Sequence, residues 1–167
     1  MEGILNFLER LAEFVTISLA NWLWFLLGLA SGFFLFRLLS AFLPVKPRRG
    51  WRIWLIFSLT IISGQIIWLG DTNLFFTLLA FVPLLLLASK GDRVGRLAVT
   101  VIFFCLIMPV NAVLDTYYAP AMAHFGLDNV FYLTDKFIRP GIWSLLYLGT
   151  RKRLPERPPQ LSPRFWR

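Results

Sequence analysis

Long apolar blocks alternate with short polar clusters along this chain. The first block, residues 14–36, contains no charged residue, and further apolar blocks follow at 53–69, 74–89 and 97–114. A helix rises by about 1.5 Å per residue, so the first block is long enough to cross a hydrocarbon core of about 30 Å. The pattern predicts four apolar helices joined by short polar connections.

A fifth segment, residues 130–150, is predicted to cross under one condition. Its uncharged part, 140–150, is too short to cross a membrane alone. The segment crosses only if Asp135, Lys136 and Arg139 lie in its first turns, where they can face protein or extend toward water. We expect the function of the chain to be located at this segment.

The two ends of the chain differ from the apolar blocks. Residues 1–13 are amphipathic, since apolar residues recur there at helical spacing among glutamates, as in a helix at a membrane surface or in the first turns of a longer helix. Residues 151–167 are basic and rich in proline, so we expect an extended cytoplasmic tail. The chain is thus interpreted as a transmembrane helical domain, 1–150, followed by this tail.

Lysine and arginine are concentrated in alternate polar segments. Residues 37–52 hold five of them, 90–96 hold three and 151–167 hold six, whereas 70–73 and 115–129 hold none. In membrane proteins, the loops on the cytoplasmic side carry the excess of basic residues. The alternation predicts an all-α, polytopic transmembrane bundle of about five spans, multi-pass in the cell membrane, with the N-terminus outside and the C-terminus cytoplasmic.

The composition agrees with this interpretation. Apolar residues make up 57% of the chain and charged residues 16%, whereas a soluble domain is about 25% charged. A formal net charge of +8 raises the question of nucleic acid binding. The basic residues lie between the apolar blocks instead of along one helix face, so we expect no nucleic acid partner. We expect anionic lipid headgroups to bind the basic inner face instead.

Residue types that commonly carry catalysis are scarce. His124 is the single histidine and Cys105 the single cysteine, and no metalloprotease, nucleophile-elbow or glycine-rich phosphate motif is present. A lone histidine in a loop is more often solvated than bound to a metal. We therefore expect that the chain is not an enzyme and has no cofactor and no metal site.

Three polar side chains interrupt the apolar blocks: Asn21, Gln65 and Asn111. Each costs free energy in hydrocarbon unless it faces another helix or a cavity. They either line a ligand pocket or form hydrogen bonds between helices, and the second interpretation is favoured for Asn21 and Gln65. Asn111 follows Pro109 and lies one helical turn before Asp115, so both side chains share a face near the outer end.

Asp135 and Arg139 are four residues apart in the predicted fifth helix and can pair along it. Arg139 could equally reach Asp115, which lies at the same predicted depth. The functional interpretation is a ligand-binding group made of Asn111, Asp115, Asp135 and Arg139, with Gln65. The structural interpretation is an ion pair that holds two helix ends together.

Gly28 and Gly32 form a GxxxG motif within the first apolar block. Small residues at this spacing allow another helix to approach closely. We expect the partner to be either a second copy of the chain, which would give a homodimer, or another membrane protein.

The stretch from Phe75 through TLLAFVPLLLLASKGDRVGRLAVTVIFFCLIMPVNAVLD, together with RPGIWSLLYLGTRKRLP and LSPRFWR, is similar to the membrane-spanning sensor region of Agr-like sensor histidine kinases with a GHKL ATP-binding domain. The resemblance covers about residues 35–167 and rests on the order of apolar spans and basic inner loops. It implies detection of an extracellular signal, often a peptide, and transmission to the cytoplasm. The phosphoacceptor helix and ATP-binding motifs of such kinases are absent from this chain.

The leading hypothesis is therefore an integral membrane sensor or receptor module of a two-component type of signal transduction. It would detect an extracellular peptide or small ligand and relay it to a cytoplasmic partner. One alternative is a substrate-binding membrane subunit of a small-molecule transporter. Another is a non-catalytic membrane assembly protein that uses the Gly28 and Gly32 face.

Overall fold

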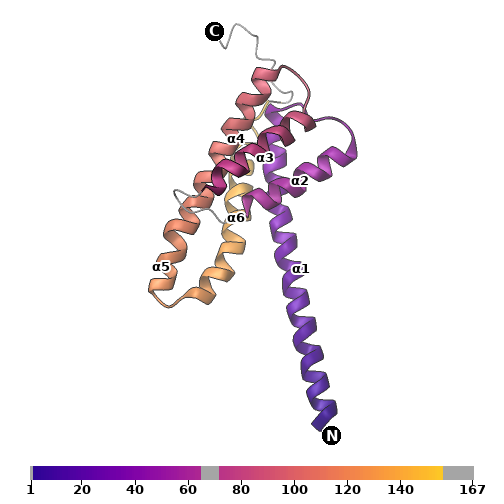
Figure 1. Ribbon diagram of the computed structural model, residues 1–167, viewed down its shortest axis with the longest axis vertical. Helices are drawn as coiled ribbons and strands as arrows, with labels where there is room; N and C mark the ends of the chain where they lie inside the picture. Colours follow the sequence, from indigo (N-terminus) through magenta and orange to yellow (C-terminus); the bar gives the residue numbers. More distant parts are fainter. Residues whose placement is uncertain (1, 65–71, 156–167) are drawn as a thin grey trace.

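A computed structural model describes residues 2–64 and 72–155, and these residues fold into helices with no strand among them (Figure 1). The predicted all-α class is confirmed. The helices are α1 (Glu2–Phe42), α2 (Arg49–Ser63), α3 (Asn73–Ala88), α4 (Arg93–Val113), the π-helix η1 (Leu114–Tyr118), α5 (Ala119–His124) and α6 (Asp128–Thr150).

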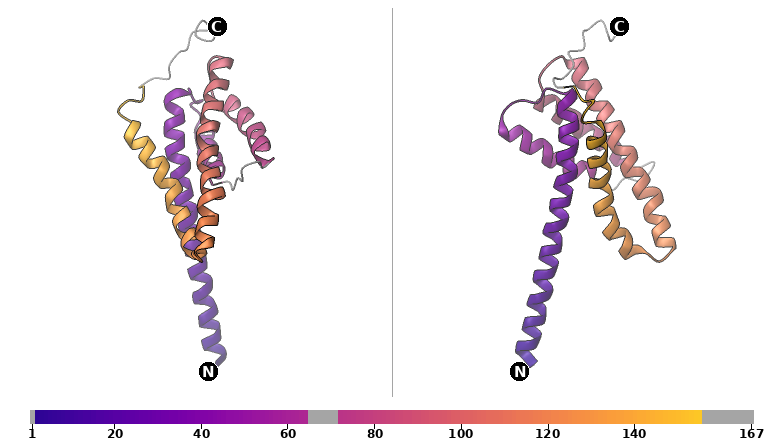
Figure 2. Two further views of the ribbon diagram at one scale, coloured as in Figure 1. Left: turned by 90° about the vertical axis from the view of Figure 1, so that its left-hand side faces the viewer. Right: turned by 180° about the vertical axis from the view of Figure 1, so that it is seen from behind.

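α1, α6 and the continuous stretch from α4 to α5 run along the length of the molecule between its two ends, whereas the shorter α2 and α3 lie obliquely across it (Figures 1 and 2). We call one of the two ends the basic end: α1, α3 and α6 end there, and α2 and α4 begin there. At the opposite end, the turn after α5 leads into α6. The N-terminal half of α1 extends well beyond the other helices (Figure 1), whereas its C-terminal half packs against α2 and α6.

Two details at the opposite end follow from the helix bounds. Residues 2–42 form one continuous helix, so the second interpretation of the amphipathic segment, the first turns of a longer helix, is confirmed for residues 2–13. The region 116–129, which separates the fourth apolar block from the fifth segment, is mostly helical, because η1 and α5 continue the axis of α4 as far as His124. The helix predicted for the fifth segment, residues 130–150, is confirmed as α6.

The second apolar block was predicted at 53–69, but α2 begins at Arg49 and ends at Ser63, with Gly64 as its C-cap. Glycine has a low helix propensity, which favours the end of a helix at Gly64. α2 has 15 residues and α3 has 16, so each is only about 22–24 Å long. Both helices therefore stop well short of the end reached by α5 (Figure 2).

Two helical stretches among the described residues, Asn21–Phe42 and Arg93–His124, are long and apolar enough to cross a membrane, and Leu74–Ala88 is a shorter apolar helix. Large apolar side chains also cover much of the surface. Trp22 is 65% exposed, Ile53 68% and Leu145 72%. Monomeric soluble proteins seldom expose so much contiguous apolar surface.

The core lies toward the basic end, where α1, α2, α3, α4 and α6 contribute side chains. Its fully buried members include Leu39 from α1, Leu59 from α2, Phe81 from α3, Ile107 from α4 and Trp143 from α6. Each of these helices buries one apolar side in the core and leaves its other sides exposed. The core therefore packs together the helices that carry the polar residues described below.

The GxxxG face of α1 is covered by α2 of the same chain. A Cβ atom on Gly32 would overlap Thr60 Oγ1 and the backbone oxygen of Ile56, and one on Gly28 would lie 3.3 Å from Thr60 Cγ2. The predicted close approach of a helix is confirmed, but the neighbour is within the chain. A homodimer through this face stays a prediction, and it would require α2 to move away.

Two connections are joined at the basic end. Lys46 N–H donates to the Ala88 carbonyl at 2.9 Å, and Lys90 N–H donates to the Pro44 carbonyl at 2.8 Å. Gly91, with φ at +107°, lets the second connection turn back into α4. This two-hydrogen-bond bridge holds residues 43–48 beside residues 89–92.

Candidate functional site

Arg139 is the centre of a buried polar group on α6. Its side chain is 6% exposed, and its Nε donates to Asp135 Oδ1 at 2.8 Å. The two residues are one helical turn apart, so the ion pair predicted from their spacing is confirmed. A guanidinium carries five N–H donors, however, and this pair uses only one of them.

The remaining donors reach two other elements. Arg139 Nη1 donates to Asn111 Oδ1 of α4 at 2.7 Å, and Arg139 Nη2 donates to Asp115 Oδ1 of η1 at 2.7 Å. Asn111 is fully buried and Asp115 is 4% exposed. The four residues Asn111, Asp115, Asp135 and Arg139, which we call the Arg139 cluster, therefore meet as predicted. Their role in binding a ligand stays a prediction.

Asp115 lies in a single turn of π-helix, Leu114–Tyr118. Pro109 lies in α4 shortly before this turn and has no backbone N–H to donate, so the regular hydrogen-bond ladder is already interrupted there. A π-turn is a rare form of helix that frequently occurs at functional sites. Here the π-turn contains Asp115, whose carboxylate accepts a hydrogen bond from Arg139.

The C-terminal end of α2 completes the cluster. Arg139 Nη1 also donates to the Ser63 carbonyl at 3.1 Å, and Asn111 Nδ2 donates to the Ile62 carbonyl at 2.8 Å. The last carbonyls of a helix have no partner within it and form the negative end of its dipole. A guanidinium and an amide therefore satisfy them while joining α2 to α4 and α6.

These two carbonyls were missed by the sequence analysis. Backbone acceptors become available only where a helix ends, and the apolar run that follows Gly64 in the sequence hid the end of α2. Gly64 itself was the available signal. Gln65, the fifth predicted site residue, lies outside the described residues.

The cluster carries one positive and two negative formal charges, so it holds a surplus negative charge. All three charged side chains are at least 89% buried. Removing charges from water is costly, and the cost is recovered only if each charge keeps all of its partners. The arrangement is therefore sensitive to any added group that competes for Arg139 or for a carboxylate.

A small cavity of about 100 Å³ lies beside the cluster, lined by residues of α1, α2 and α6. Its charged walls are Asp135, Lys136 and Arg139, and its uncharged walls include Trp24 and Ser31. About three water molecules fill such a volume, so it suits water, a small ion or one functional group of a larger molecule. Lys136 was not among the predicted site residues.

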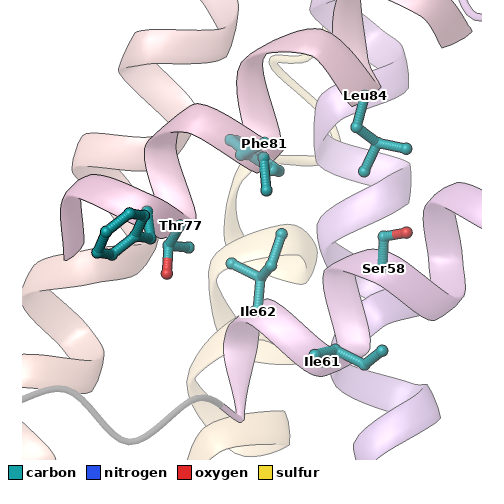
Figure 3. A pocket seen from close by; sticks show the side chains of 8 residues that line it. Ser58, Ile61, Ile62, Thr77, Phe81 and Leu84 are labelled. Atoms are coloured by element: carbon teal, nitrogen blue, oxygen red, sulfur yellow. The ribbon is translucent and has the colours of Figure 1, made fainter. Parts of the chain in front are cut away.

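A larger, mainly apolar hollow of about 540 Å³ separates α2 from α3 (Figure 3). Ser58, Ile61 and Ile62 face Thr77, Phe81 and Leu84 across it. Its wall is linked to the cluster, because the carbonyl of Ile62 is the acceptor for Asn111. The hollow depends on the angle between two helices, which the sequence pattern does not specify.

His124 is the last residue of α5 and is exposed. Its ring meets the Phe125 ring edge-on, with 5.4 Å between the ring centroids. Among the side chains that the structure describes, no three His, Cys, Asp or Glu residues are grouped so that they could hold a metal ion. The Arg139 cluster is thus the site with the most convergent polar chemistry in the described part of the chain.

No protein-family model, curated protein or solved structure matches this chain. The resemblance to the sensor region of Agr-like kinases stays a prediction.

Proposed function

We propose that the chain crosses the membrane five times, with its N-terminus outside and its basic end at the cytoplasmic surface. The alternation of lysine and arginine along the sequence supports this orientation. So does the apolar side-chain surface, which suits contact with lipid. α2 and α3 would be the two shortest of the five crossings, and the carbonyls of Ile62 and Ser63 at the end of α2 lie at the level of the Arg139 cluster.

In this orientation the Arg139 cluster lies in the outer half of the membrane. Arg139 is about 16 Å from the end of α6 at Thr150, and Asn111 is about 27 Å from the start of α4 at Arg93, measured along each helix. The hydrocarbon core is about 30 Å thick. Ionisable residues at such depths are expensive and mark functional sites by default.

The chain acts, in this proposal, as a membrane sensor or receptor that relays an outer signal, for which a peptide or a small molecule is the candidate, to a cytoplasmic partner. The observation that carries it is the set of hydrogen bonds from Arg139 to α2, α4 and η1. A signal that competes for one of these partners would change how α6 is held. Because α6 is a continuous helix to Thr150, such a change would move its cytoplasmic end.

The second candidate is a substrate-binding subunit of a small-molecule transporter. The observation that favours it is α2, which ends within the protein and directs its last carbonyls at the cluster. Transporters commonly build their binding sites from such interrupted helices near the middle of the membrane.

We expect replacement of Asp115 by asparagine to remove a bound signal molecule while the fold is retained. The amide keeps the shape of the carboxylate but loses the charge that Arg139 contacts at 2.7 Å. The measurement is mass spectrometry of small molecules and peptides that co-purify with the wild type and with Asp115→Asn. Asp92→Asn is the matched control, since Asp92 caps α4 at the basic end, far along the helix from the cluster.

A molecule retained equally by Asp115→Asn and by the wild type would contradict a binding role for the cluster. Once a molecule is identified, vesicles distinguish the two functions. A sensor binds it and alters maleimide labelling of an Arg151→Cys variant without moving it across the bilayer. A transport subunit accumulates it inside the vesicle when its partner proteins are present.

A further inference from the structure

A second hollow lies at the basic end, between the two connections that the backbone bridge joins. It has a volume of about 410 Å³ and is lined by Lys46, Pro47, Arg48, Trp51 and Lys90. We call it the basic hollow. A hollow of about 500 Å³ adjoins it, with Arg48 and Trp51 in both and Trp54 in the second.

The three cationic side chains of the basic hollow have no hydrogen bond or ion pair with the described residues. Lys46 Nζ lies 5.3 Å from the centre of the Trp51 ring, a contact that positions the ammonium without neutralising it. The neighbouring charged residues Arg96 and Asp92 have hydrogen-bond partners outside the hollow. Arg96 Nη1 donates to the Leu86 carbonyl at 2.7 Å, and Asp92 accepts from Gly95 N–H at 2.9 Å.

The hollow is built by the fold and does not arise from flexible surface residues alone. The bridge from Lys46 N–H to Ala88 and from Lys90 N–H to Pro44 holds the two connections at a fixed separation. α2 begins at this point with no side-chain cap and no acidic residue in its first turn. Free N–H groups at a helix start add to the attraction for an anion.

We propose that the basic hollow binds the phosphate headgroup of an anionic glycerophospholipid from the cytoplasmic leaflet. The phosphate would lie among Lys46, Arg48 and Lys90, and the glycerol would lie against Trp51 and Trp54. Apolar residues continue along the exposed side of α2, where Ile53 is 68% exposed and Phe57 40%, so an acyl chain has a surface to follow. The site rests on the proposed membrane orientation but not on the sensory role.

The test is native mass spectrometry of the detergent-purified full chain with added phosphatidylglycerol, phosphatidylcholine or inorganic phosphate. The variant is Lys46→Ala with Lys90→Ala, and the control is Arg151→Ala with Arg153→Ala. The control removes the same charge from exposed positions after α6, outside the hollow. We expect phosphatidylglycerol affinity to fall about 25-fold in the variant, because each lysine near a phosphate contributes about fivefold, and less than threefold in the control.

Equal losses in the variant and the control would overturn the site in favour of diffuse attraction to the whole basic end. Equal binding of phosphatidylcholine would overturn it as well, since that headgroup has no net charge. Displacement of the lipid by an equal concentration of inorganic phosphate would show a free phosphate site instead. Arg48→Ala, measured alone, supplies an independent variant, for which we expect a loss of about fivefold.

Discussion

Replacing Arg139 by alanine is expected to lower the free energy of unfolding by about 3–5 kcal/mol. The substitution leaves two buried carboxylates without their cation and removes the donor to the Ser63 carbonyl. A buried charge that loses its partner is costly, because its desolvation is no longer compensated by that partner. Thermal and chemical unfolding of the detergent-purified protein measures the change.

Arg37→Ala is the matched control, because it removes an exposed arginine whose guanidinium, among the described residues, donates to the Tyr147 hydroxyl and lies over its ring. We expect a loss of about 1 kcal/mol or less there. A variant that replaces Arg139 by methionine and both aspartates by asparagine should recover much of the stability, since the uncompensated charges are gone. Equal losses in Arg139→Ala and Arg37→Ala would contradict the buried cluster.

Substituting Gly32 by alanine is the second change with a large expected effect, about 1–3 kcal/mol of lost stability. The added methyl group would overlap Thr60 Oγ1 and the Ile56 carbonyl, which are themselves hydrogen-bonded at 2.9 Å. α1 and α2 must then separate, which loosens the attachment of the helix whose end the Arg139 cluster holds.

Two other glycines provide a graded comparison by the same unfolding measurement. Gly28→Ala should cost less than Gly32→Ala, because its Cβ would be 3.3 Å from Thr60 Cγ2. Gly141→Ala meets nothing within 4 Å and lies in α6, so it should be neutral or stabilising by up to about 1 kcal/mol. If Gly32→Ala proves as stable as Gly141→Ala, the close packing of α1 on α2 is wrong.

The polar cluster could be predicted from the sequence because two simple rules applied. The spacing of Asp135 and Arg139 depends only on helix periodicity, and Asn111 and Asp115 share a face for the same reason. Charged residues in an apolar environment pair with one another, so the Asn111 and Asp115 face was expected to meet the Asp135 and Arg139 pair.

The remaining partners could not be predicted because they depend on where helices end and how they pack. Apolar residues continue past Gly64, so hydropathy did not mark the end of α2 or the carbonyl of Ser63. The GxxxG motif indicated a close contact at Gly32 but not which helix would make it. The basic hollow likewise requires Lys46 and Lys90, distant in sequence, to be placed together by a backbone bridge.

The orientation of the chain in the membrane is the claim on which the proposed signal path depends. It is tested most directly by labelling single cysteines in intact cells with a membrane-impermeant maleimide, in a Cys105→Ala background. Phe125→Cys, in the turn between α5 and α6, is 72% exposed in the wild type and should be labelled from outside. Arg151→Cys, after α6, should be labelled only once the membrane is opened. Labelling of both positions from outside would contradict the account, and so would protection of both.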